Sequence, residues 1–520
     1  MLLHQPVDYH ADLRPLRPAI DAHDHVWCYR DLVAHSHAIA RFLQSQNVQV
    51  GERIAVLGLN SATHFALYLA ASRIGAVTVS VNFRLAPAEL AFILDDAHAR
   101  ILFVTDSSFD ETVTETIAQR TGDTHLVADR DDAATSLRAT LETAGPEVVR
   151  AEAVDENEAV LQLYTSGTTG KPKGAVLSHR NVSSLVGMMA VTNDGQYTST
   201  NVDLTVAPLF HIGGVGVGYI ILATGGHCIL QEAFDPVRVV ETIQSRRVNT
   251  MFMVPAMIQA IVKLVPNIED YDLSSLQSIA YGAAPISASL LREALDLFGC
   301  KMQQVYGMTE TTGTVVALSF DDHQRALAGE EHLLRSCGKP CPGNEVKIID
   351  DDGAELGANQ TGQICLRSSS NMLGYFNRAQ ATADTIQDGW VHTGDAGFRD
   401  AEGFVFLRDR LKDMVVSGGE NIYPVEVENI LAAMPGVIEV AVIGVPDEQY
   451  GEALLAVFAL KPDSPVTLES MIEHCRGQLA GYKIPRQLQV VDALPRNPSG
   501  KVLKTVLREP WWEGHERRIG

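Results

Sequence analysis

The segment Tyr164–Gly174 carries the residue types best suited to bind a phosphate chain. It reads YTSGTTGKPKG and follows the apolar run AVLQL at 159–163. Such a loop offers backbone N–H groups, hydroxyls and two ammonium groups together, which is what a polyphosphate needs. A Walker A loop requires GxxxxGK followed by Ser or Thr, whereas here the spacing is GxxGK and Pro172 follows the lysine. The segment therefore predicts a phosphate-binding loop of a different class.

This loop resembles the signature loop of the adenylate-forming superfamily, which includes acyl-CoA synthetases, luciferases and peptide-synthetase adenylation domains. The other motifs of that superfamily follow in the expected order: APLFHIGG (207–214), YGAAPI (281–286), QQVYGMTET (303–311), GQICLR (362–367), GWVHTGDAG (389–397), RDRLKDMVVSGGENIYPVEVE (408–428) and PRNPSGKVLK (495–504). Because the resemblance covers nearly the whole chain, the sequence is identified as a member of this superfamily, in its acyl-CoA synthetase branch.

The resemblance implies a reaction in two halves. A carboxylate attacks the α-phosphate of ATP, which gives acyl-AMP and pyrophosphate, and the thiol of coenzyme A then takes the acyl group. ATP, Mg²⁺ and coenzyme A as co-substrate are the implied cofactors. Hard oxygen ligands suit Mg²⁺ that bridges phosphates, so Glu310 and the hydroxyl of Thr165 are the expected metal ligands.

The resemblance also assigns the nucleotide site. Thr309 would donate to the α-phosphate, Tyr306 would stack on adenine, and Asp395 with Arg410 would bind the ribose. Core packing of Tyr306 and a turn-capping role for Asp395 are the plainer alternatives. The remaining predicted binding residues are Thr165, Ser166, Gly167, Thr168, Thr169, Gly170, Lys171 and Lys173 on the phosphates, Gly282, Ala283 and Ala284 opposite Tyr306, Gln304 near the base, and Gly307 with Met308.

The superfamily moves its C-terminal domain between the two half-reactions, and several positions match that movement. Lys501 matches the lysine that is brought over the α-phosphate and the acyl carboxylate, where one cation relieves the repulsion between two oxyanions. Lys412 matches the hinge, at which many relatives have Asp. Ser417, Gly418 and Gly419 would line the pantetheine tunnel, because glycines let a thin arm pass close to the backbone.

The acyl site is expected beside His211, which is either a residue at the tunnel mouth or a core histidine. The pocket walls are predicted to be His211–Gly216, Val254–Met257, Tyr281–Ala284 and Met308. These residues are mostly apolar or small and include no Lys, Arg, Asp or Glu, so we expect a hydrophobic acid, such as a medium- or long-chain fatty acid. Aryl, phenylpropanoid and steroid side-chain acids stay open. A ligase that loads a separate carrier protein and a non-catalytic nucleotide-binding scaffold are the alternative functions.

Alternating short apolar runs and helical patterns must position these residues. RIAVLGL (53–59), AVTVSV (76–81), RILFVT (100–105), DLTVAP (203–208), HCILQE (227–232) and TMFMVP (250–255) are each followed by polar or amphipathic sequence. Apolar strands that alternate with helices predict parallel sheets covered by helices. We therefore expect an α/β fold: an N-terminal domain (1–410) with αβ layers to about 335 and a small β subdomain at 336–410, then a mobile α+β domain at 411–520.

The composition of the chain bears on whether the protein binds nucleic acid, spans a membrane or forms disulfides. Lys plus Arg number 41 against 64 Asp plus Glu, a net charge of −23. Such an acidic chain does not favour nucleic-acid partners. The uncharged stretch 204–231 contains Pro208 and six glycines, so a buried strand, helix and strand fit it better than a transmembrane segment. Seven scattered cysteines and a start without a signal-peptide pattern predict free thiols and a cytoplasmic location. The sequence leaves a homodimer and the role of Trp511 and Trp512 open.

Overall fold

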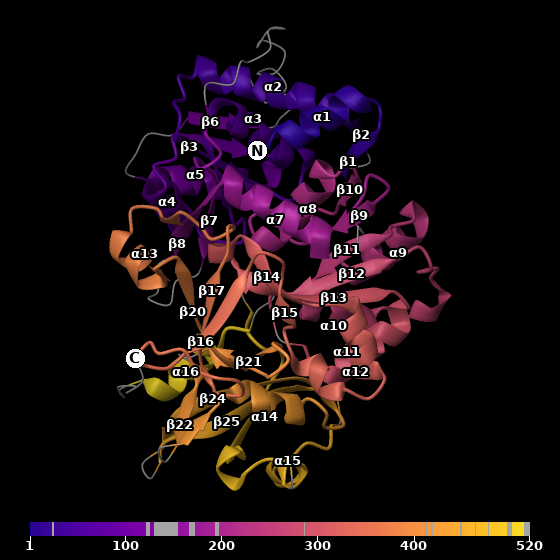
Figure 1. The fold of residues 1–520 in the computed structure, drawn as a ribbon, viewed down its shortest axis with the longest axis vertical. Helices are drawn as coiled ribbons and strands as arrows, with labels where there is room; N and C mark the ends of the chain where they lie inside the picture. The colour runs from indigo at the N-terminus through magenta and orange to yellow at the C-terminus, as the bar shows by residue number, and fades with distance from the viewer. Residues whose placement is uncertain are drawn as a thin grey trace.

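The computed structural model describes residues 1–22, 25–120, 125–128, 154–165, 172–192, 197–284, 286–410, 413–417, 420–447, 450–462, 464–476, 478–496 and 502–513. Within these residues there are four β-sheets: a seven-stranded and a nine-stranded sheet with flanking helices, a small antiparallel sheet, and a sheet in the C-terminal region (Figure 1). The predicted α/β architecture is confirmed.

The seven-stranded sheet holds the strands on either side of the predicted phosphate loop. Its order is β18-β8-β7-β4-β3-β5-β6. The strands are β3 (Arg53–Leu57), β4 (Val77–Val81), β5 (Ile101–Val104), β6 (His125–Ala128), β7 (Ala159–Thr165), β8 (Lys173–Ser178) and β18 (Gly374–Tyr375), and the helices are α2 (Tyr29–Ser45), α3 (Ala62–Ile74), α4 (Pro87–Asp96), α5 (Asp110–Gln119) and α7 (His179–Thr192). β7 and β8 are antiparallel, with Thr165 opposite Lys173. The loop therefore joins the two strands of a hairpin.

The nine-stranded sheet has the order β15-β14-β13-β12-β11-β9-β10-β1-β2. Its strands are β1 (Pro18–Ala22), β2 (His25–Cys28), β9 (Val202–Thr205), β10 (His227–Leu230), β11 (Thr250–Met253), β12 (Ser278–Gly282), β13 (Lys301–Met308), β14 (Gly313–Leu318) and β15 (Lys339–Pro340). Its helices are α1 (Gln5–Leu13), α8 (Ile212–Ala223), α9 (Pro236–Arg246), α10 (Pro255–Leu264), α11 (Ala288–Phe298) and α12 (Phe320–Leu327). The core side chains of α9 to α12 pack on one face, and α8 lies on the other.

The small sheet contains β16 (Glu345–Ile349), β17 (Gly362–Arg367), β19 (Ile386–Gln387), β20 (Trp390–Arg399) and β21 (Val405–Arg410), with α13 (Ala379–Thr385) nearby. The segments EVKIID (345–350), GQICLR (362–367), GWVHTGD (389–395) and GFVFLRDR (403–410) form four of its strands, which pair antiparallel and give the small β subdomain expected at 336–410. However, β15 and β18 come from the same stretch of chain and join the two larger sheets as edge strands. This stretch therefore connects the large sheets to each other.

The C-terminal region, at the bottom of Figure 1, builds a five-stranded sheet with helices. It comprises β22 (Val415–Ser417), β23 (Glu420–Ile422), α14 (Pro424–Leu431), β24 (Val437–Asp447), β25 (Gly451–Leu460), α15 (Leu468–Cys475), β26 (Gln487–Val491) and α16 (Lys504–Trp512). Short 3₁₀ turns lie at Ser107–Phe109, Ile268–Asp270, Thr309–Thr311, Glu331–Arg335 and Gly481–Lys483. The indole of Trp512 donates to the carbonyl of Gly444 (3.0 Å), so this tryptophan packs against β24.

The uncharged stretch 204–231 folds mainly as part of β9, the helix α8 and β10, as expected. In the portion of the chain that the structure describes, no helix combines the length and the hydropathy needed to cross a bilayer.

Candidate active site

The carboxyl end of β13 is the centre of the site. The hydroxyl of Tyr306 donates to Oδ2 of Asp395 across 2.7 Å. Asp395 lies in β20 of the small sheet and is only 4% exposed. Its backbone pairs with Arg410 of β21, and its N–H donates to the hydroxyl of Thr393 (3.0 Å). The predicted adenine residue and the predicted ribose residue are thus held together by a hydrogen bond between two sheets.

Glu310 follows β13 in the 3₁₀ turn Thr309–Thr311 and is 6% exposed. The hydroxyl of Tyr375 donates to its Oε1 across 2.6 Å. Tyr375 belongs to β18, which pairs with β8, and the ammonium of Lys173 lies 5.1 Å from the centre of its ring. Because a cation over an aromatic face is attracted to the ring, Tyr375 links the phosphate-loop strand to the acid. Sequence reasoning missed Tyr375, since nothing in its short local motif indicates its distant partner.

Backbone contacts fix the turn that carries Glu310. The N–H of Met372 donates to the carbonyl of Glu310 (2.8 Å), and the hydroxyl of Thr312 donates to the carbonyl of Ser370 (2.6 Å). At Gly307 a Cβ atom would lie 1.7 Å from the carbonyl oxygen of Gly313, so only glycine lets β13 and β14 approach here. The segment 370–372 on one side and the close approach of β13 and β14 on the other therefore hold the turn.

The predicted wall opposite Tyr306 follows β12. A Cβ on Gly282 would lie 2.2 Å from the carbonyl oxygen of Val305, and Ala283 has a left-handed backbone with φ of 66°. A left-handed alanine is uncommon and is strained relative to glycine. Close backbone approach at this edge explains the run of small residues. Gln304, half-buried, lies in β13 next to this wall.

His211 is the N-cap residue of α8 and is half-buried. Burial, with a smaller contribution from the positive charge of Arg84, lowers the pKa of His211 to about 4. Its Nε2 atom has no hydrogen-bond partner among the described residues. At neutral pH the ring is therefore a neutral imidazole with one nitrogen available to a ligand. The ring of Phe210 lies 4.5 Å away, centre to centre.

Tyr281 lies on the opposite face of the sheet from Val254, so the structure contradicts the prediction that both belong to one wall. Its side chain is fully buried in the core formed with α9 to α12, and its hydroxyl bonds Nε2 of His323 at 2.9 Å. Burial raises the pKa of the Tyr281 phenol well above its ordinary value. Neighbouring residues of a strand point to opposite faces, so Ala280 and Gly282 lie on the α8 face instead.

An apolar cluster lies on the α8 face of the nine-stranded sheet. It contains Ala207, Phe252, Val254 and Ala280, and Val217 of α8 packs against it. Sequence reasoning included Val254 but missed Phe252, although strand alternation places both on one face. A Cβ on Gly213 would lie 3.0 Å from the Phe252 ring, so the glycine at the start of α8 makes room for that ring.

Several predicted residues lie outside the part of the chain that the structure describes. They are Ser166, Gly167, Thr168, Thr169, Gly170, Lys171, Lys412, Gly418, Gly419 and Lys501. Of their neighbours, Thr165 ends β7 and Lys173 begins β8, so the ends of the phosphate loop are placed. Ser417 ends β22, opposite Gly451 of β25.

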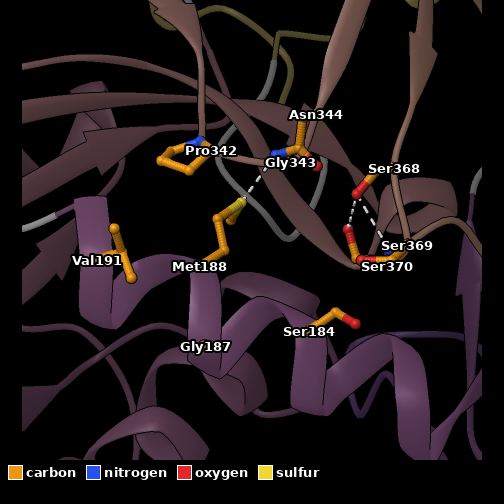
Figure 2. A pocket seen from close by; sticks show the side chains of 10 residues that line it. All are labelled: Ser184, Gly187, Met188, Val191, Pro342, Gly343, Asn344, Ser368, Ser369 and Ser370. Atoms are coloured by element: carbon orange, nitrogen blue, oxygen red, sulfur yellow. Dashed lines mark hydrogen bonds between the residues drawn. The ribbon is translucent and has the colours of Figure 1, made fainter.

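A surface pocket among the described residues is separate from these groups. It has a volume of about 360 Å³, and Figure 2 shows its lining: Ser184, Gly187, Met188 and Val191 of α7, with Pro342, Gly343, Asn344, Ser368, Ser369 and Ser370 opposite. The amide of Asn344 donates to the sulfur of Met188 (2.9 Å) across it. No predicted site residue lines this pocket. Its serine segment contacts the turn that carries Glu310, because the carbonyl of Ser370 accepts from the hydroxyl of Thr312.

Comparison with known proteins agrees with the geometry. The family model described as AMP-binding enzyme matches residues 7–376, and that of the AMP-binding enzyme C-terminal domain matches residues 426–501. The fatty acid–acyl-carrier-protein ligase ScoC of Streptomyces coeruleorubidus is 35% identical over 99% of this chain and 98% of its own length. Feruloyl-CoA synthase of an Amycolatopsis species is 37% identical over 92% of this chain and 93% of its own length.

Among solved structures, ATP-bound MatB from Rhodopseudomonas palustris superposes with a TM-score of 0.89 and 29% identity, covering 99% of this chain and all of that one. The matched family models together span most of the chain, and both relatives cover it almost completely. This chain therefore belongs to the AMP-binding enzyme family, in the acyl-CoA synthetase branch of the adenylate-forming superfamily, and is an AMP-forming acid–thiol ligase.

Proposed function

We propose that the enzyme activates a hydrophobic carboxylic acid, a medium- or long-chain fatty acid, and transfers it to coenzyme A. In the first half-reaction a carboxylate oxygen bonds the α-phosphorus of ATP, the bond to the β-phosphate oxygen breaks, and pyrophosphate leaves. In the second, the CoA thiolate attacks the acyl carbon and AMP leaves with the bonding electrons. The products are acyl-CoA, AMP and pyrophosphate.

The observation that carries the proposal is the convergence at the end of β13. Within five residues, Tyr306 bonds Asp395 of the small sheet and Glu310 bonds Tyr375 of the seven-stranded sheet. Asp395 and Arg410 would bind the ribose, Tyr306 would stack on the adenine, and Thr309 would donate to the α-phosphate. This short segment thus carries a tyrosine bonded to the buried carboxylate of Asp395 and, four residues on, the hydrogen-bonded acid Glu310, which suit a nucleotide and its counter-ion.

The donor set fits Mg²⁺. Glu310 offers a carboxylate and Thr165 a hydroxyl, and Mg²⁺ favours one or two such oxygen ligands together with substrate phosphates. When bound there, Mg²⁺ would neutralise charge on the phosphates. The protein's own part is to hold Glu310 in place through Tyr375 and to present the loop 165–173.

The C-terminal region supplies the remaining groups. Lys501 would stabilise charge in the adenylation transition state, Lys412 would act as the hinge, and Ser417, Gly418 and Gly419 would line the pantetheine path. We place the domain boundary at 410/411 and the start of the small β subdomain near 336. Neutral His211 would lie beside the acyl carboxylate and the CoA thiol.

The apolar cluster around Phe252 and Ala280 supports a hydrophobic acid. An aryl or phenylpropanoid acid is the second candidate for the acyl group, favoured by the 37% identical feruloyl-CoA synthase. A carrier protein is the second candidate for the acceptor, because the relative that covers 99% of the chain is named a fatty acid–acyl-carrier-protein ligase. A cytoplasmic location agrees with the seven free cysteines, which suit a reducing compartment.

Pyrophosphate release with Mg-ATP over a panel of acids tests the proposal. The panel spans short to long fatty acids, cinnamic and benzoic acids and a steroid side-chain acid, each with and without CoA. Sustained turnover that requires CoA, greatest for a fatty acid, is expected. A single burst that CoA does not extend would replace the CoA acceptor with a carrier protein, and a preference for aryl acids would replace the fatty acid.

A further inference from the structure

Gln303 is a buried amide with no partner among the described residues. It lies in β13, three residues before Tyr306, and is 1% exposed. Neither its Oε1 nor its Nε2 has a hydrogen-bond partner in the described part of the chain. Buried polar groups in folded proteins are nearly always hydrogen-bonded, because leaving them unpaired is costly. An amide with both ends unpaired therefore indicates a ligand or a function.

The strand register places Gln303 on the acyl side of the sheet. Gln303 is paired with Ala280 of β12, and Ala280 with Phe252 of β11. Side chains at the same register of parallel neighbours point to the same face. Phe252 and Ala280 belong to the apolar cluster against Val217 of α8, so Gln303 faces that cluster.

The depth of Gln303 follows from the strand rise. Val305 is the next residue of β13 on the same face, and it packs against the same apolar cluster one position before Tyr306. Two residues of a strand span about 7 Å, so Gln303 lies that much deeper than Val305. Gln303 is therefore set back along the strand from Tyr306, on the face of the apolar cluster rather than beside the predicted nucleotide groups.

We propose that Gln303 binds a hydroxyl group that the substrate carries at a distance from its carboxylate. A hydroxyl can donate to Oε1 and accept from Nε2 at once, so it satisfies both unpaired atoms, whereas a carbonyl or ether satisfies Nε2 alone. The other members of the cluster, Ala207, Phe252, Val254 and Ala280, are apolar. The substrate class is thus a hydroxylated aryl-alkanoic or hydroxy fatty acid. This inference rests on the acid-activating function proposed above.

A site built to hydrogen-bond a substrate hydroxyl rejects the analogue that lacks it, because the protein group is then buried unpaired. With one neutral amide as the partner, kcat/KM for the hydroxylated acid should exceed that for the acid without the hydroxyl on the order of 10- to 100-fold. An acid without the hydroxyl still fits the apolar walls, so it remains a slow substrate.

The test compares matched acids with the full-length enzyme and Mg-ATP. The pairs are 3-(4-hydroxyphenyl)propanoate with 3-phenylpropanoate, and 8-hydroxyoctanoate with octanoate, read as kcat/KM for pyrophosphate release. The wild-type enzyme is expected to prefer the hydroxylated member of at least one pair by about 10-fold or more. In Gln303→Leu that preference falls to about onefold or inverts, mainly because the deoxy acid improves.

Gln231→Leu is the matched control. Gln231 is also a buried glutamine of this sheet region, 6% exposed, but its Nε2 donates to the carbonyl of Arg238 and the hydroxyl of Thr242. Its replacement is expected to lower thermal stability and to leave the preference between paired acids unchanged. Gln303→Leu should unfold at the same temperature as wild type or higher, since it removes an unpaired amide. Gln303→Met takes its place if the leucine variant does not fold.

Equal kcat/KM for both members of each pair, or a hydroxyl preference that survives in Gln303→Leu, overturns the role of Gln303. Those outcomes leave the acid-activating function standing, because pyrophosphate is still released. Absence of pyrophosphate release with every acid of the larger panel overturns the proposed function, and this inference with it.

Discussion

The hydroxyl of Tyr375 donates a 2.6 Å hydrogen bond to Oε1 of Glu310, although the two residues are 65 positions apart in the chain. Tyr375 reaches the acid because the two-residue strand β18 pairs with β8 at the edge of the seven-stranded sheet. The same ring lies beside the ammonium of Lys173. One aromatic residue thus orients the expected metal ligand and contacts the strand that leaves the phosphate loop.

Replacing Tyr375 with Phe tests this arrangement. The variant keeps the ring beside Lys173 but leaves Glu310 without its donor. Loss of a group that orients a metal ligand commonly costs about 10- to 100-fold in metal affinity or activity, so the Mg²⁺ concentration for half-maximal pyrophosphate release should rise about 10-fold. Tyr68→Phe, which removes a buried hydroxyl bonded to Ser80 and Leu209, should leave that Mg²⁺ dependence unchanged.

The pair Tyr306 and Asp395 predicts coupled effects on ATP. Asp395→Asn should raise the KM for ATP about 10-fold and leave the KM for the acid nearly unchanged, because the carboxylate is expected to bind the ribose. A hydrogen bond to a charged group contributes about 1.5–3 kcal/mol. The loss of ATP binding in the double variant Tyr306→Phe/Asp395→Asn should therefore differ from the sum of the losses in the two single variants. Initial rates of all four proteins check this. Additivity within about 0.3 kcal/mol would show that the bond does not serve nucleotide binding.

Lys501→Ala should separate the two half-reactions. Removing the cation withdraws charge stabilisation from adenylation, which should slow acyl-AMP formation about 100-fold or more. Thioester formation from synthetic acyl-AMP and CoA should persist. Lys461→Ala, at an exposed position just after β25, is the control and should match wild type in both assays. Equal losses in the two half-reactions would contradict the separate role of Lys501.

Gly282 and Gly187 predict opposite stability changes on substitution by alanine. A Cβ at Gly282 would lie 2.2 Å from the carbonyl oxygen of Val305, so Gly282→Ala should lower the free energy of unfolding by about 1–3 kcal/mol and weaken ATP binding. At Gly187, within α7, a Cβ would meet no described atom within 4 Å, and Gly187→Ala should stabilise the fold by about 0.5–1 kcal/mol. Urea unfolding with and without ATP measures both.

Buried histidines around the N-terminal helix predict acid sensitivity. Burial, followed by the charge of Arg73, lowers the pKa of His4 to about 4, and burial likewise lowers that of His179 to about 4. His179 Nδ1 accepts from the N–H of Leu3 (3.2 Å), which requires the unprotonated nitrogen. In the unfolded chain these histidines have an ordinary pKa of about 6.5, so they take up protons as the pH falls below that value. The stability contributed by these histidines is therefore complete above about pH 6.5 and is lost as the pH falls towards about 4.

The expected loss is about 3 kcal/mol for each of these two histidines at full protonation. Thermal unfolding from about pH 8 to about pH 4 measures it, and His179→Asn should flatten the fall at the acid end of that range. His332→Gln, at an exposed position, should reproduce the wild-type curve. A wild-type transition temperature that stays constant down to about pH 4.5 would contradict the prediction.

Family membership, the order of the motifs and most of the strands follow from the amino-acid sequence alone. Short apolar runs such as TMFMVP are buried on both faces, so composition predicts them, and β11 and β12 lie where those runs and their motifs indicate. The antiparallel strands of the small sheet and the helix α14 are predictable for similar local reasons. A local sequence pattern is enough to predict a helix or strand when the residues that stabilise that element lie within the element itself.

Which side chains meet depends on the tertiary structure. Tyr281 is expected in the acyl wall, but strand alternation turns it to the opposite face, towards His323. Phe252 and Gln303 share one face of the sheet only because β11, β12 and β13 adopt one register. Tyr375 meets Glu310 through pairing between segments about 200 residues apart in sequence, β8 and β18. Register and sheet edges are set by long-range pairing, and no local spacing encodes them.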